Sequence, residues 1–271
     1  MALDQVDVDK LPPEGEEEMS FLDHLEHLRW HIIRSLVAIV IIGIGVFLAK
    51  DLVFDHIILG PTKDSFLTYQ LLCSIGDFIC MKPGTSLEII TRDIGEQFIT
   101  HIKSSFWIGL IVAFPYVFWE FWRFVKPGLY ENERKAAGGM VFTCSALFIA
   151  GVLFGYFVIS PFAVSFLSAY SVSPDVQNTT TLSSFVNYMT MFTIPTGLVF
   201  ELPIVIYFLA KIGIVTPEFL KTYRKHAVVI IFIAASIITP PDVITQFLIA
   251  IPLFFLYEVS IIIAQRQMPK T

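Results

Sequence analysis

An acidic residue inside a long apolar segment is the first position of this sequence at which chemistry is expected. Glu201 lies in the apolar run from Gly197 to Ile204. In a segment that spans a bilayer, a charged side chain costs about 2.5–3.5 kcal/mol on insertion scales and therefore faces protein or water. We expect a functional role for Glu201; the alternative is a carboxyl group hydrogen-bonded to a neighbouring helix. Glu258 is a weaker candidate, because its position lets it reach the membrane surface.

A dense group of charges, residues 124–135, follows an aromatic segment. It contains two carboxylates, Glu131 and Glu133, and three cations at positions 126, 134 and 135. A carboxylate can bind a guanidinium group through two parallel hydrogen bonds, so this segment is a suitable acceptor for a cationic peptide. The alternative, which composition alone favours, is a solvated charged segment that caps a helix. Asp242, which follows two prolines, fits the N-cap of the next helix.

Other catalytic and metal-binding patterns are weak. His24, His27 and His31 share one face of a helix, but no H-E-x-x-H motif is present and Glu26 points away from that face. The sequence contains no G-x-S-x-G motif, P-loop or dinucleotide fingerprint. We therefore expect no enzymatic activity, no metal site and no cofactor.

The composition shows what kind of scaffold positions these residues. Of 271 residues, 55% are hydrophobic and only 15% are charged, against about 25% charged in soluble domains. The mean hydropathy is +0.71. A net charge of −6 also argues against nucleic-acid partners. These values exclude a soluble fold and a disordered chain, and they predict an all-α protein with several membrane spans.

Hydropathy and helical spacing predict one six-span domain over residues 20–265. The spans are expected at about 30–48, 104–124, 138–160, 185–210, 227–238 and 243–263. An amphipathic helix at residues 20–29 is expected to lie in the interface and to run without a break into the first span. A second surface helix is expected over residues 93–103. Pro195 and Pro203 should kink the fourth span, and the fifth covers only ~18 Å.

The distribution of Lys and Arg predicts the orientation. The loops after spans two and four are basic, whereas residues 161–184 contain no Lys or Arg. The positive-inside rule then places both termini in the cytoplasm. Residues 1–19 are expected to be a disordered acidic tail, and residues 266–271 a second cytoplasmic tail. In the long outer loop, Cys73 and Cys80 either form a disulfide or stay as free thiols.

Four segments together resemble the TatC family, the large polytopic subunit of the twin-arginine protein translocase. They are Phe-Leu-Asp-His-Leu-Glu-His-Leu-Arg at 21–29, Phe-Val-Lys-Pro-Gly-Leu-Tyr-Glu-Asn-Glu-Arg at 124–134, Phe-Glu-Leu-Pro at 200–203, and Thr-Pro-Pro-Asp-Val-Ile-Thr-Gln at 239–246. The resemblance covers residues 20–265 and implies six spans with short final helices. It further implies a receptor in the bacterial inner membrane for folded precursors with paired-arginine signal peptides.

The resemblance also implies site residues. Glu133 matches the carboxylate that accepts the arginine pair. Glu201 matches the buried glutamate that meets the inserted signal peptide or small subunits. The neighbours of the signal-binding carboxylate are Arg29, Phe124, Pro127 and Arg134. The positions where a single-span partner docks are Thr239, Asp242 and Gln246. Pro61 and Phe98 match positions in the first outer loop. One departure is His27, which replaces an acidic residue of the family motif, while Glu26 lies about 100° away around the helix.

The implied partners are small single-span subunits of the TatA and TatB type, twin-arginine signal peptides and membrane lipid. A homo-oligomer within a hetero-complex is implied as well, and the family uses the proton-motive force. The alternative function is a proton- or cation-coupled carrier of small solutes that uses Glu201 and Glu258. Such carriers commonly have internal repeats with broken helices, and no such repeat is visible in this sequence.

Overall fold

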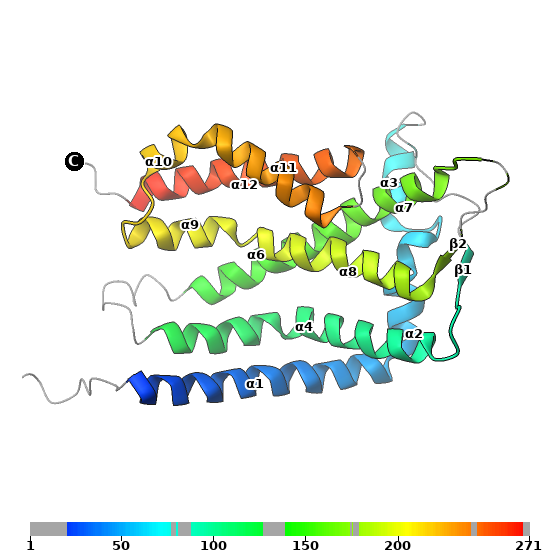
Figure 1. Ribbon diagram of the computed structural model, residues 1–271, viewed down its shortest axis with the longest axis horizontal. Helices are drawn as coiled ribbons and strands as arrows, with labels where there is room; N and C mark the ends of the chain where they lie inside the picture. Colours follow the sequence, from blue (N-terminus) through cyan, green and yellow to red (C-terminus); the bar gives the residue numbers. More distant parts are fainter. Residues whose placement is uncertain are drawn as a thin grey trace, which may run out of the picture.

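The computed structural model is a bundle of long, roughly parallel helices (Figure 1). It describes residues 21–76, 80, 88–126, 139–173, 175, 179–239 and 243–267. The helices that make up the length of the bundle are α1 (Phe21–Leu48), α4 (Glu96–Val125), α6 (Met140–Phe154), α7 (Ser160–Ala169), α8 (Leu182–Val199), α9 (Leu202–Lys211), α11 (Arg224–Ile238) and α12 (Val243–Gln267).

The two ends of the bundle differ in character. The first residue of α1 and the last residue of α12 lie at the same end, which we call the terminal end (Figure 1). The opposite end, which we call the strand end, carries two short strands, β1 (Glu88–Ile90) and β2 (Thr179–Thr181). A chain that starts and finishes at one end of a bundle passes along it an even number of times.

Five helical segments are long and apolar enough to cross a bilayer; they are Glu26–Leu48, Glu96–Val125, Met140–Ala169, Leu182–Lys211 and Thr245–Arg266. The sixth expected span corresponds to α11, whose 15 residues cover about 22 Å, less than the ~30 Å hydrocarbon core. The expectation that the last two helices are short is wrong for the final one. Helix α12 has 25 residues, because Ala264, Gln265, Arg266 and Gln267 are good helix formers and continue the helix past the expected boundary.

Two helix boundaries also differ from the expectations. Residues 96–103 form no separate surface helix but are the first turns of α4, because nothing in that segment interrupts the helical hydrogen bonds. The third crossing does not end at residue 160. After α6, a π-helical segment (Gly155–Ile159) leads directly into α7, which extends the crossing to Ala169. At the start of α1, the expected continuity is confirmed, since one helix runs from Phe21 to Leu48.

The fourth crossing is broken at Pro203, as expected, whereas Pro195 lies inside the continuous helix α8. Helix α8 ends at Val199 and α9 begins at Leu202, with Phe200 and Glu201 between them. Pro203 has no N–H group to continue the hydrogen-bond ladder of α8. The backbone carbonyl of Glu201 instead accepts bonds from Ile204 (3.0 Å) and Val205 (3.1 Å) and so starts a new helix. Glu201 therefore lies at the break itself.

The long loop between α1 and α4 is folded rather than extended. It contains α2 (Lys50–Leu52), a π-helical turn (Val53–Ile58), a 3-10 turn (Gly60–Thr62) and α3 (Leu67–Ile75), and it crosses the strand end of the bundle (Figure 1). The pairing of Cys73 with Cys80, left open by the sequence, is a disulfide. Strand β1 pairs in parallel with β2, matching Glu88 with Thr179. The all-α expectation missed this pair, which joins segments 91 positions apart.

Small residues allow the central helices to approach closely. A Cβ atom at Gly155 would lie 2.3 Å from the backbone oxygen of Phe192, and one at Gly151 would lie 2.8 Å from the Cα of Gly197. The buried core joins residues of the third and fourth crossings with residues of α11 and α12. In contrast, apolar side chains of α1 are widely exposed, as Ile41 (63%) and Leu48 (78%) illustrate. Exposed apolar stripes of this kind suit contact with lipid.

Candidate functional site

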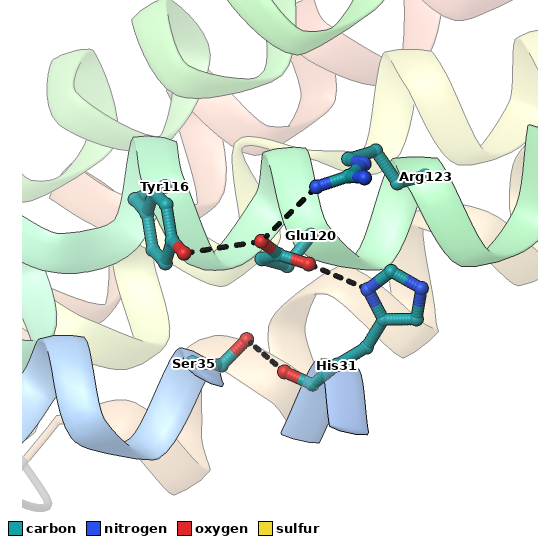
Figure 2. Close-up of polar contacts among 5 residues, drawn as sticks. All are labelled: His31, Ser35, Tyr116, Glu120 and Arg123. Carbon is teal, nitrogen blue, oxygen red and sulfur yellow. Dashed lines mark hydrogen bonds and ion pairs between the residues drawn. The ribbon is translucent and has the colours of Figure 1, made fainter. Parts of the chain in front are cut away.

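A buried carboxylate, Glu120, lies at the terminal end of the bundle between α1 and α4 (Figure 2). Its Oε2 is 2.5 Å from Nδ1 of His31, and its Oε1 accepts a 3.0 Å hydrogen bond from the Tyr116 hydroxyl. The guanidinium of Arg123 is 3.6 Å from Oε1. Helix α4 presents Tyr116, Glu120 and Arg123 on one face because these positions are four and three residues apart.

The surroundings of Glu120 explain how a carboxylate is accommodated there. Its side chain is only 1% exposed, and burying an ion without partners is strongly unfavourable. His31 and Arg123 supply cationic or hydrogen-bonding groups, and Arg123 also stacks over the ring of Trp119 at 4.8 Å. The cluster thus joins α1 to α4 at the terminal end of the bundle.

The predicted signal-binding residues on α1 are near this cluster in sequence and are free of ion pairs. Glu26, His27 and Arg29 lie in the first turns of α1, and all three side chains are exposed. Within the described residues, none of the three forms an ion pair, and the guanidinium of Arg29 is 6.0 Å from the Trp30 ring centroid. Phe124, at the end of α4, packs edge-on against His31 at 6.2 Å.

The rest of the predicted signal site falls outside the described residues. Glu133, Pro127 and Arg134 lie in that part of the chain, between α4 and α6. The structure places the end of α4, from which this segment departs, beside the start of α1 (Figure 1). Among the described residues, no group of three or more His, Cys, Asp or Glu side chains is arranged to hold a metal ion.

Glu201 has fewer partners than Glu120. Its Oε1 is buried and has no hydrogen-bond partner among the described residues. On the neighbouring helix α6, the carboxyl faces the Cys144 thiol and the backbone of Phe148. The close packing of Gly151 against Gly197 holds α6 and α8 together just beyond this point. The break in the fourth crossing therefore presents a carboxyl group with unused hydrogen-bonding capacity inside the apolar part of the bundle.

The predicted docking residues are already hydrogen-bonded within the chain. Thr239 is buried, and its hydroxyl donates to the carbonyl of Ala235 at 2.9 Å. Gln246 donates through Nε2 to the carbonyl of Phe232 at 3.2 Å, which links α12 to α11. Asp242 lies outside the described residues. These contacts stabilise the hairpin of α11 and α12.

Of the two positions expected in the long loop before α4, Pro61 lies there, whereas Phe98 lies in the first turn of α4 because that helix begins at Glu96. Pro61 is buried, and its carbonyl accepts a 2.9 Å hydrogen bond from the Tyr69 hydroxyl. Burial raises the pKa of Tyr69, so this donor stays protonated. The same hydroxyl is 3.2 Å from the carbonyl of Pro161 in α7, and this contact attaches the loop to the bundle. Phe98 is 62% exposed and touches the ring of Phe47 edge-on at 6.5 Å.

Sequence reasoning missed two buried carboxylates. Glu120 lies in an aromatic segment, so the rule that an acidic residue inside an apolar span is a functional candidate applies to it as well as to Glu201. The rule did not select Glu120 because this residue lies close to the end of the expected span. Glu96 is 8% exposed and accepts hydrogen bonds from the backbone N–H groups of Arg92 (2.7 Å) and Ser183 (2.9 Å). Ser183 is in the first turn of α8, so Glu96 ties the start of α4 to that helix. Glu258, in contrast, forms a 2.7 Å ion pair with Arg224.

Comparison with known proteins identifies the family. The family model of the Sec-independent protein translocase protein (TatC) matches residues 23–252. A Sec-independent protein translocase protein TatC from Blattabacterium is 40% identical over 253 residues, covering 91% of this chain and 95% of that relative. One from Carboxydothermus hydrogenoformans is 38% identical over 261 residues, covering 94% and 96% respectively.

Solved structures agree with this assignment. A crystal structure described as the twin arginine translocase receptor TatC is 33% identical and covers 90% of this chain and 99% of its own, with a TM-score of 0.69. A second crystal structure of that receptor, in the detergent DDM, is 34% identical with a TM-score of 0.70, covering 88% and 98%. The match extends over nearly the full length of both partners. This chain belongs to the TatC family of Sec-independent protein translocase components.

Proposed function

We propose that this chain is the signal-peptide receptor and core subunit of a twin-arginine translocase in a bacterial inner membrane. The observation that carries the proposal is the placement of α1 and α4 side by side at the terminal end, in a chain of the TatC family. This arrangement presents the exposed Glu26, His27 and Arg29 next to the point where the segment with Glu133 leaves α4.

The proposed orientation has six crossings with both termini in the cytoplasm. Cations gather at the terminal end, including Arg123, Lys211, Arg224 and Arg266, and the positive-inside rule assigns such an end to the cytoplasm. Helix α11 would be the fifth crossing, and its 15 residues would be accommodated by local thinning of the bilayer. The first turns of α1 would then lie at the cytoplasmic interface.

In the proposed recognition step, Glu133 accepts the arginine pair of the signal peptide. An arginine cannot lose its charge at any physiological pH, so the pair stays at the cytoplasmic surface beside carboxylates. Phe124, Pro127 and Arg134 flank that acceptor. His27 stands where the family motif has an acid, so Glu133 carries more of the recognition in this chain, with Glu26 as the nearest other carboxylate.

In the proposed later steps, the apolar part of the signal peptide enters the bundle and meets Glu201. The unpartnered Oε1 of Glu201 supports this role, since a buried acceptor without a donor gains a hydrogen bond when a polar group arrives. Small single-span subunits of the TatA and TatB type would dock at the hairpin of α11 and α12, near Thr239, Asp242 and Gln246. Several copies of the chain would assemble with them.

The receptor proposal is tested by cross-linking a twin-arginine signal peptide to the membrane-inserted protein. Glu133→Gln should reduce cross-linking by about tenfold, because one charge-assisted bidentate pair is lost. Glu131→Gln, two residues away in the same segment, is the matched control and should cross-link as the parent does. Equal cross-linking by both variants, with normal insertion, would remove Glu133 from the site.

The carrier hypothesis has less support from the contacts. It requires Glu258 as a second exchanging carboxylate, and Glu258 is held by Arg224 at 2.7 Å. Solute uptake into liposomes that contain this protein alone would favour the carrier over the receptor.

A further inference from the structure

A shallow groove of about 330 Å³ runs along the outer face of α1. We call it the α1 groove, and its main lining residues are Trp30, Ile33, Arg34, Val37 and Ile41 of α1 with Tyr116 of α4. The residues from α1 follow one another at three- and four-residue spacing, so they share one face of the helix. From Trp30 to Ile41 the groove covers about 16 Å of helix, which is close to half the ~30 Å hydrocarbon core.

The α1 groove combines an apolar floor with a single cation. Arg34 is exposed, and within the described residues its guanidinium has no ion pair or hydrogen bond. It lies one helical turn beyond Trp30, an amphipathic residue typical of the membrane interface. A guanidinium at this depth stays charged and requires an anionic partner, which the protein side of the groove does not supply.

The polar wall of the groove is already occupied by internal contacts. The Tyr116 hydroxyl donates to Glu120, which in turn is held by His31 (Figure 2). Arg123 lies over the ring of Trp119, whose centroid is 5.6 Å from that of Tyr116. Glu120 is therefore committed to its own partners and is 1% exposed, so the described residues of the groove offer Arg34 no anion.

We propose that the α1 groove binds an anionic phospholipid, with the phosphate on Arg34 and one acyl chain along Ile33, Val37 and Ile41. A guanidinium binds phosphate through paired hydrogen bonds, and basic pockets beside transmembrane helices on the cytoplasmic side are known to suit anionic head groups. The groove is as long as one leaflet, which matches a lipid. Its place in the inner leaflet rests on the proposed orientation, whereas binding itself does not.

The test measures lipids retained by the purified full-length protein in a neutral detergent, by native mass spectrometry. Dioleoyl phosphatidylglycerol is compared with dioleoyl phosphatidylcholine, which has the same acyl chains but no net charge. The parent should retain phosphatidylglycerol preferentially. Arg34→Gln should weaken that retention by about tenfold, the effect of one charge-assisted pair. Arg266→Gln, an exposed cation on α12 at the same end, should leave it unchanged.

Two further variants separate charge from shape. Arg34→Lys keeps the charge but loses the paired geometry and should give intermediate retention. Ile41→Trp fills the apolar half of the groove and should reduce phosphatidylglycerol retention with Arg34 intact. Equal retention of the two lipids by the parent, or parental retention by Arg34→Gln, overturns the proposal, as does cross-linking that shows a protein helix in the groove. No signal peptide is used, so failure here leaves the receptor proposal untouched.

Discussion

Glu120 and Glu201 have the same sequence signature and opposite surroundings. Each is a carboxylate in an apolar segment; Glu120 is buried as a whole, and Glu201 is half-buried with its Oε1 atom buried. Glu120 has His31, Tyr116 and Arg123 around it, whereas Oε1 of Glu201 has no partner among the described residues. A carboxylate surrounded by donors fixes two helices together, whereas one with spare capacity is available to a ligand. The pair therefore allows a structural role at Glu120 to be tested against the functional role proposed for Glu201.

The largest expected effect is on stability, and it falls on Glu120 alone. Glu120→Ala leaves His31 and Arg123 without their shared partner, and breaking a buried ion pair from one side costs about 3–5 kcal/mol. The free energy of unfolding, measured by SDS titration of the protein in mixed micelles, should fall by that amount. Glu201→Ala, the matched control, should lower it by less than about 1 kcal/mol, because Oε1 of Glu201 has no hydrogen-bond partner among the described residues and the Cys144 thiol is only a weak donor.

A similar loss for both variants would break the comparison. It would mean that Glu201 has a stabilising partner, such as the Cys144 thiol that it faces, and Cys144→Ala would then reproduce the loss. Glu120→Gln is the milder companion variant, since an amide keeps one acceptor for the Tyr116 hydroxyl.

The second expected effect is on function, and it falls on Glu201. Glu201→Ala should reduce export of a folded twin-arginine precursor by about tenfold or more, equivalent to ~1.4 kcal/mol, while signal-peptide cross-linking stays at the parental level. Glu201 would then act after recognition, when a polar group reaches Oε1. Export and cross-linking are measured on the same membrane vesicles. Full export by Glu201→Ala would return this residue to a structural role.

Much of the architecture followed from local patterns. Long apolar runs located the crossings, and Pro203 predicted the break that places Glu201. The patterns failed where the deciding partner is distant in sequence. His31 lies 89 positions from Glu120, and Ser183 lies 87 positions from Glu96, so no window of sequence contains either pair. The parallel pairing of β1 with β2 was missed for the same reason.

Helix ends were the other source of error. The sequence predicted an end at residue 160, before Pro161, but proline is tolerated in the first turn of a helix, and α7 begins at Ser160 and continues to Ala169. The short final helix implied by family resemblance was wrong because polar residues that favour a helix extend α12 beyond its apolar run to Gln267. The site on α1 could be located from its motif, but its relation to α4 required the three-dimensional packing.

The smallest expected effect concerns the ion pair of Arg224 and Glu258, which provides a third point for the comparison. Its distance, 2.7 Å, is similar to that of His31 and Glu120, but its side chains are 47% and 30% exposed. Exposed pairs contribute about 0–1 kcal/mol, because water solvates both partners when the pair opens. Glu258→Gln should therefore lower the free energy of unfolding by less than 1 kcal/mol in the same SDS titration and leave export unchanged. A loss as large as that of Glu120→Ala would show that distance, rather than burial, decides what these carboxylates contribute.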